Sequence, residues 1–111
     1  PGHTPGSCCY SFDSNLIAGD TLFVFGCGRC DLHGGSPEEM YKSLKNLKEN
    51  LSKETVIMPG HNYSIKRNST LKEEIQGNPF FSFNNLKDFT QYRMHEHDKT
   101  RIEPYAPIIE R

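Results

Sequence analysis

The chain has 111 residues, of which 34% are hydrophobic and 24% are charged, and its formal net charge is −1. This length predicts a single domain or a part of one. The near-neutral charge balance argues against nucleic acid as a partner, and it leaves no basic patch for an anionic membrane surface. The hydrophobic share is low even when the 9 glycines are added, which predicts a thin core for this chain on its own.

The four cysteines bear on the compartment. A chain of this length with helical patterning does not resemble a small scaffold held by disulfides, so we expect reduced thiols and a cytoplasmic protein. The longest apolar run, around residues 22–25, is far too short to cross a bilayer. No pattern of a signal peptide opens the chain.

The first quarter of the chain has the pattern of β-structure. Short apolar stretches at 8–12 and 16–18 are separated by turn residues at 13–15. A third stretch, at 21–25, is rich in β-branched and aromatic residues. We expect it to be a strand that ends at a glycine-containing loop over 26–29.

The clearest helix signal follows at 36–51. Ser36 and Glu39 form a capping box around Pro37 at the first helical position. Apolar residues then recur every three or four positions, at Met40, Leu44, Leu47 and Leu51. Residues 55–58 predict a buried strand, so the middle of the chain has the strand–helix–strand order of a layered α/β fold.

The last third is more polar. A short helix is expected over 69–75, ended by Gly77 and Pro79. Asn84 or Asn85 is expected to cap another helix, and the tail from residue 103 is expected to be extended because it contains two prolines.

Three residues are candidates for a metal site. His3 and His61 each follow a glycine in a loop, and Asp20 follows a glycine at the end of a strand. Strand ends of an α/β sheet are where sites are built, and imidazoles with a carboxylate are ligands of catalytic zinc, which activates water near neutral pH. The same glycine pairs are also common in turns, and spacing alone leaves both interpretations open.

Two further patterns contain cysteine or histidine. Cys27 and Cys30 form a C-x-x-C pair, which suits a zinc half-site or a redox pair, but Cys8 and Cys9 have the wrong spacing to complete a structural zinc site. We interpret the pair as small residues in a tight turn. The segment 95–98 (HEHD) lies in a polar stretch, and we interpret it as a solvated helix end.

Four segments, in this order, resemble the metallo-β-lactamase superfamily. They are residues 1–7 (PGHTPGS), 19–23 (GDTLF), 26–29 (GCGR) and 59–63 (PGHNY). The resemblance covers about residues 1–83 and is closest to the glyoxalase II-like branch, the hydroxyacylglutathione hydrolases and their relatives. The tail around 93–99 is similar to zinc-dependent hydrolases of bacterial polyketide gene clusters.

The resemblance implies roles for four residues. His3 would be the third histidine of a first metal site, Asp20 the catalytic carboxylate that bridges two metals, and His61 a ligand of the second metal. Two zinc ions are implied, with a metal-bound hydroxide that attacks the carbonyl of a thioester, either an acyl-glutathione or an acyl group on a carrier protein. Tyr63 would lie near the thiol-carrier part of this substrate.

The chain also departs from the family pattern. The defining H-x-H-x-D-H motif belongs upstream of His3 and is absent here, and the segment 95–98 cannot replace it because Lys99 and Thr100 stand where aspartate and histidine are required. We therefore expect residues 1–111 to be a partial domain of α/β class, the C-terminal half of an αββα sandwich. Its partners would be the missing N-terminal half and a small-molecule thioester or an acyl-carrier protein. Alone, it is expected to bind zinc weakly and to hydrolyse nothing.

Two alternatives remain. Residues 26–29 with Asp31 also resemble the persulfide dioxygenases, which are mononuclear iron enzymes of the same superfamily. The iron would then be held by His3, Asp20 and a histidine that is absent here. The other alternative is a non-catalytic domain that has lost the metal site. Iron against zinc content separates the two enzymes, and an upstream H-x-H-x-D-H motif separates an enzyme from a binding domain.

Overall fold

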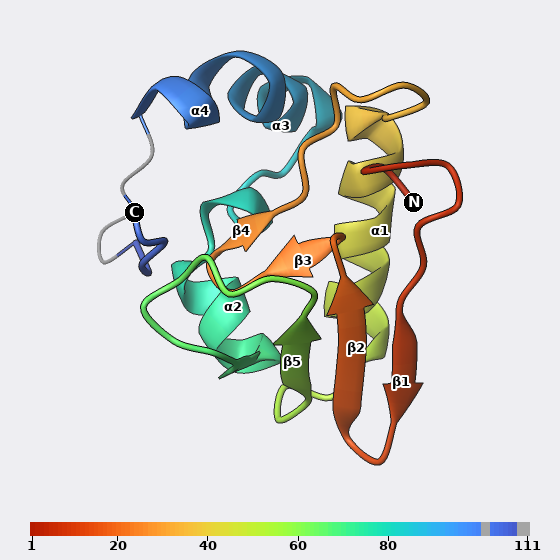
Figure 1. Ribbon diagram of the computed structural model, residues 1–111, viewed down its shortest axis with the longest axis vertical. Helices are drawn as coiled ribbons and strands as arrows, with labels where there is room; N and C mark the ends of the chain where they lie inside the picture. The colour runs from red at the N-terminus through yellow and green to blue at the C-terminus, as the bar shows by residue number, and fades with distance from the viewer. Residues whose placement is uncertain (101–102, 109–111) are drawn as a thin grey trace.

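The computed structural model describes residues 1–100 and 103–108, and its centre is a four-stranded sheet backed by a helix (Figure 1). The strand order is β1-β2-β5-β6, in which β2 and β5 are parallel and the two outer pairs are antiparallel. The strands are β1 (Tyr10–Phe12), β2 (Asn15–Gly19), β5 (Val56–Pro59) and β6 (Ser69–Thr70). The predicted first two strands are therefore confirmed, and they form a hairpin whose turn residues Asp13 and Ser14 have φ of 44° and 63°.

The predicted strand over 21–25 is confirmed only for residues 22–23, and the first half of the predicted loop over 26–29 is a strand. The chain instead forms a second, two-stranded sheet from β3 (Leu22–Phe23) and β4 (Gly26–Cys27). The chain reverses at Phe25, which has φ of 61° and donates its backbone N–H to the carboxylate of Glu74 at 3.0 Å. Gly26 must be a glycine because a Cβ there would lie 2.6 Å from the ring of Tyr105. Both contacts are made by residues distant in the chain.

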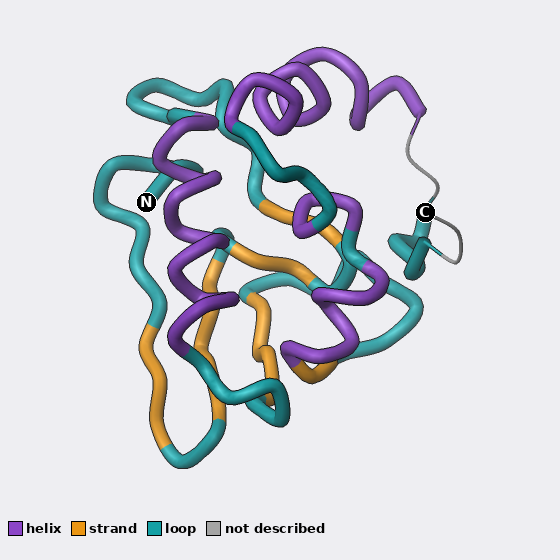
Figure 2. Tube along the Cα trace, turned by 180° about the vertical axis from the view of Figure 1, so that it is seen from behind, coloured by secondary structure: helices purple, strands orange, loops and turns teal. Residues whose placement is uncertain are grey.

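Helix α1 (Pro37–Asn50) connects the two parallel strands, as the strand–helix–strand order predicts. The Ser36 hydroxyl accepts a hydrogen bond from the backbone N–H of Glu39 at 3.2 Å, which confirms the predicted start of the helix. Figure 2 shows the helix lying along one face of the sheet. Its buried residues Met40 and Leu44 pack in one core with apolar residues of β2 and β5, namely Leu16, Ala18 and Ile57.

The other face of the sheet carries exposed apolar side chains. Tyr10, Ile17 and Met58 are paired across three strands by the sheet register, and they are 64%, 44% and 43% exposed. The prediction that residues 55–58 are a buried strand is therefore wrong for one face: Ile57 lies under α1, whereas Met58 points to the uncovered side. The described residues supply a helical layer for only one side of this sheet.

The remaining helical segments follow β6; in Figure 1 the first of them lies beside β5, and the last ones lie at the top of the view. They are α2 (Leu71–Gly77), the 3₁₀ turn η1 (Pro79–Phe81), α3 (Leu86–Gln91), the π-helical turn η2 (Tyr92–Glu96) and α4 (His97–Thr100). Helix α2 begins two residues later than predicted because Ser69 and Thr70 pair with β5 first. Asn85 caps α3, as one of the two predicted alternatives. Among the described residues, no helix combines the length and the apolar content needed to cross a membrane.

Candidate metal centre

The three predicted ligands are brought together at one edge of the sheet. Asp20 directly follows β2, and His61 follows β5 by two residues. Because β2 and β5 are parallel neighbours, their carboxyl ends meet at the same edge, which is the usual position of a site in α/β folds. His3 reaches the same point from the turn that precedes β1.

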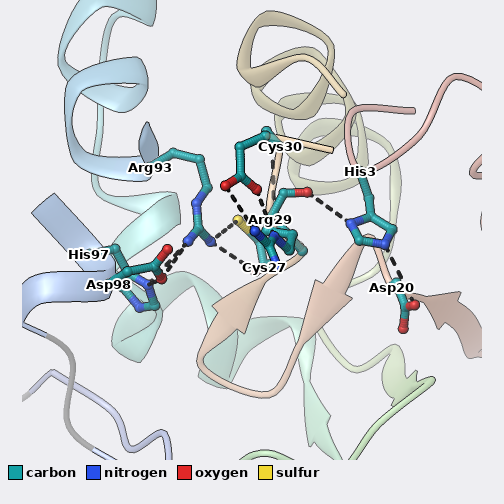
Figure 3. A network of polar contacts seen from close by, with 10 residues as sticks. His3, Asp20, Cys27, Arg29, Cys30, Arg93, His97 and Asp98 are labelled. Carbon is teal, nitrogen blue, oxygen red and sulfur yellow. Dashed lines mark hydrogen bonds and ion pairs between the residues drawn. The ribbon is translucent and has the colours of Figure 1, made fainter. Parts of the chain in front are cut away.

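Each carboxylate oxygen of Asp20 faces a different histidine. Oδ1 lies 2.7 Å from Nδ1 of His61, and Oδ2 lies 3.7 Å from Nε2 of His3. Figure 3 shows that the other ring nitrogen of His3 points to the carbonyl oxygen of Arg29, at 2.8 Å. Since a carbonyl only accepts, Nδ1 of His3 donates this hydrogen bond, and Nε2 is the ring nitrogen directed at Asp20. A cation between these two groups would stabilise this arrangement.

Two glycines allow the backbone to come this close. A Cβ at Gly28 would lie 1.9 Å from the backbone oxygen of Asp20 and 3.2 Å from the Cβ of His3. A Cβ at Gly60 would lie 2.9 Å from Oδ1 of Asp20, and the Gly60 N–H donates to the carbonyl of Gly19 at 2.7 Å. The glycine that precedes His61 and the second glycine of residues 26–29 are therefore required by packing around Asp20.

The three candidate ligands line a pocket of about 870 Å³. Tyr63 lines it and is 49% exposed. Its ring stacks on His61, with ring centres 5.2 Å apart and planes inclined by 6°, and the ring of Phe23 meets it edge-on at 5.0 Å. One wall beside the candidate ligands is therefore aromatic and accessible.

The pocket is also lined by two residues of the segment 93–99, to which the sequence assigned no role in a site. They are Arg93 and Asp98. The interpretation of 95–98 as a solvated helix end is wrong for His97, which is 3% exposed and packs 4.7 Å from the ring of Phe80. A signal for this burial was present, because Phe89, Arg93 and His97 recur at the four-residue spacing of one helix face.

Cys27 and Cys30 are both buried and free. Burial raises the pKa of the Cys27 thiol to about 11 and the pKa of the Cys30 thiol to about 12. Both thiols are therefore protonated near neutral pH, whereas metal binding and thiol exchange need the thiolate. These values favour a packing role for the pair, although Cys27 lies in β4 and not in a turn.

The chemistry of His3, Asp20 and His61 fits zinc, which binds imidazole nitrogen and carboxylate oxygen. Within the part of the chain that the structure describes, however, no group of three or more histidine, cysteine, aspartate or glutamate side chains is arranged to hold a metal ion by itself. The donor atoms of the three residues suit zinc, but they do not complete a metal site within the described residues.

Comparison with known proteins identifies the family of this chain. The family model of the metallo-beta-lactamase superfamily matches residues 1–61, and the chain belongs to this superfamily. The chain is 34% identical to a probable polyketide biosynthesis zinc-dependent hydrolase, PksB, from Bacillus subtilis. The match extends over 99 residues, which are 89% of this chain and 44% of the relative. It is 45% identical over 64 residues to a hydroxyacylglutathione hydrolase from Shewanella loihica, covering 58% of this chain and 24% of the relative.

A solved structure has the same fold. The crystal structure of ETHE1 from Myxococcus xanthus superposes with a TM-score of 0.79 and 32% identity, covering 86% of this chain and 42% of that chain. The chain thus spans less than half the length of the relatives it matches. The expected family and the expected α/β fold, one half of a metallo-β-lactamase sandwich, are confirmed, whereas the roles of the individual site residues stay predictions.

Proposed function

We propose that the complete domain containing this chain is a zinc-dependent hydrolase that cleaves thioesters. The superfamily is one of metal-dependent hydrolases, and the relatives include a zinc-dependent hydrolase and a hydroxyacylglutathione hydrolase. The observation that carries the proposal is the convergence of His3, Asp20 and His61 on an open pocket, with each oxygen of Asp20 directed at a different imidazole.

Each ligand has a defined part in this proposal. When bound, zinc supplies Lewis acidity and a water activated near neutral pH. His3 would bind one ion through Nε2, because its Nδ1–H is held by the Arg29 carbonyl. Asp20 would help to hold both ions, and His61 would bind the second. Among the described residues these side chains supply only a part of the ligands, so we expect the isolated chain to bind zinc weakly and to hydrolyse nothing.

The aromatic wall of the pocket supports binding of the thiol carrier. Tyr63 stacks on His61, so a group that packs against the exposed face of its ring lies beside the metal ligands. The thiol arm of glutathione or of an acyl-carrier protein places apolar methylene groups next to the thioester sulfur. We propose that this arm lies along Tyr63 and Phe23, with the acyl carbonyl at the metal centre.

The uncovered face of the sheet supports a second element of the proposal. Tyr10, Ile17 and Met58 form an apolar row of the kind that a sheet buries against another layer. We propose that this row packs against the N-terminal half of the same domain, which would also bring the remaining metal ligands.

The experiment measures the metal and the substrate of the complete protein. Zinc and iron are determined in the purified protein, and thiol release is followed with an acyl-glutathione and with an acyl-pantetheine. We expect about two zinc ions and thiol release from at least one substrate. One iron with oxygen uptake on a persulfide would favour the dioxygenase instead, and a folded protein without metal and without turnover would favour a binding domain.

A further inference from the structure

A buried arginine lies next to the pocket. It is not one of the candidate metal ligands, and it is not part of the sheet. The side chain of Arg93 is 2% exposed. One terminal nitrogen donates to the backbone carbonyl of Cys27 at 3.0 Å, and the other donates to Asp98 at 3.0 Å. The guanidinium also lies over the ring of Phe80, 4.9 Å from its centre. Arg93 thus ties the C-terminal helices to the end of β4.

This arrangement is costly for a purely structural contact. A buried charge is expensive, and the Nε of Arg93 has no hydrogen-bond partner among the described residues. Burial acts to lower the pKa of Arg93, but its contacts with Cys27 and Asp98 outweigh this and raise the pKa, so the guanidinium is charged. Arg93 also lies in the π-helical turn η2, and such turns are frequent at functional sites. An apolar side chain would fill the same space at lower cost.

The carbonyl that Arg93 holds begins a short path to the metal centre. Cys27 is followed by Gly28, whose backbone packs against Asp20 and donates to the carbonyl of Thr21 at 3.1 Å. The next residue, Arg29, offers the carbonyl that binds Nδ1 of His3. Figure 3 shows Arg93 at one end of segment 27–29 and His3 at the other. No flexible side chain interrupts this path, because it runs through consecutive backbone groups.

We propose that Arg93 is a positioning residue: by holding segment 27–29 it fixes the Arg29 carbonyl, which orients the imidazole of His3 with Nε2 toward Asp20. This inference rests on the proposed metal centre but not on thioester cleavage. Direct recognition of substrate by Arg93 is the competing explanation, since it lines the pocket. The exposures favour positioning, because the Arg93 side chain is 2% exposed whereas its partner Asp98 is 59% exposed and faces the pocket.

The test compares Arg93→Met and Arg93→Lys in the complete protein, with Lys42→Met as the control. Lys42 is an exposed lysine of α1 paired with Glu38 at 3.3 Å. The first readout is the ¹⁵N NMR signature of the His3 ring in metal-free protein, and the second is zinc affinity by competition with a chelator. Neither readout requires turnover. The positioning role of Arg93 can therefore be rejected while thioester cleavage is confirmed, and thioester cleavage can be rejected while the positioning role is confirmed.

We expect Arg93→Met to lose the uniform Nδ1–H form of His3 and to bind zinc about tenfold more weakly, the lower end of what loss of an outer-shell partner costs. The kcat should fall with KM little changed. Arg93→Lys keeps the charge but cannot donate to Cys27 and Asp98 in the two directions of a guanidinium, so we expect an intermediate effect. This variant also provides the test if Arg93→Met fails to fold. A rise in KM with the His3 signature and zinc affinity of the wild type would overturn the proposal.

Discussion

Two polar clusters lie at opposite ends of the β3–β4 hairpin, and they differ in which groups supply their hydrogen bonds. The buried cluster is Glu74 with Ser69 and Asn78, and the open cluster is Asp20 with His3 and His61. The carboxylate of Glu74 is 0% exposed and accepts hydrogen bonds from Phe25 N–H at 3.0 Å, from Ser69 at 2.6 Å and from Asn78 at 2.8 Å.

The open cluster has a carboxylate of similar chemistry with different partners. The Asp20 side chain is 34% exposed, and its two oxygens lie 2.7 Å and 3.7 Å from imidazole nitrogens of His61 and His3. The chain itself satisfies Glu74, which is what a structural group requires. In the proposed metal centre, a cation would complete the contacts of Asp20. A structural carboxylate and a functional one therefore cannot be told apart by their polarity alone. The hydrogen-bond partners that the fold supplies to each carboxylate make the difference.

The largest expected effect is on the activity of the open cluster. Asp20→Asn keeps the size of the side chain but removes the charge and one acceptor oxygen. We expect activity of the complete protein to fall at least about a hundredfold, since loss of an outer-shell partner alone costs about ten- to a hundredfold. Stability in urea should change little. Asp13→Asn, at the exposed β1–β2 turn, is the matched control and should retain activity. Equal losses in both variants would contradict the distinction.

The next effect is on the stability of the buried cluster. Glu74→Ala leaves the Phe25 N–H and the groups of Ser69 and Asn78 without their buried acceptor. We expect the free energy of unfolding to fall by about 2 to 3 kcal/mol. Urea unfolding measures it, with Glu49→Ala on the exposed face of α1 as control. An unchanged midpoint would show that Glu74 is not a structural group.

The smallest effect concerns pH. Burial raises the pKa of Glu74 above its ordinary value, although its hydrogen bonds act in the opposite direction. Between the ordinary and the raised value the folded chain holds a proton that the unfolded chain has lost, so this group makes stability fall as pH rises. We expect Glu74→Gln to lose this slope. Urea unfolding across a pH series compares the two proteins; identical slopes would mean that Glu74 does not titrate differently in the folded state.

Much of the fold could be predicted because its signals are local. The Ser36 cap lies three residues from the backbone group it binds, and the turn at Asp13 and Ser14 lies within one hairpin. Gly60, before His61, stands where a Cβ would meet Asp20, and Gly19, before Asp20, has a φ of 52° that favours glycine. The missed features depend on distant residues. The turn at Phe25 is held by Glu74, 49 positions away, and Arg93 contacts Cys27 across 66 positions.

The sequence by itself determined the family, the crossover of β2, α1 and β5, and the three residues that converge at the sheet edge. It could do so because strand ends and glycine turns leave a local pattern in the chain. Only the tertiary structure decided that each oxygen of Asp20 faces a different histidine, that one face of the sheet is uncovered, and that Arg93 is buried beside segment 27–29. These depend on which elements pack together, and hydrophobic packing carries no local signature of its distant partner.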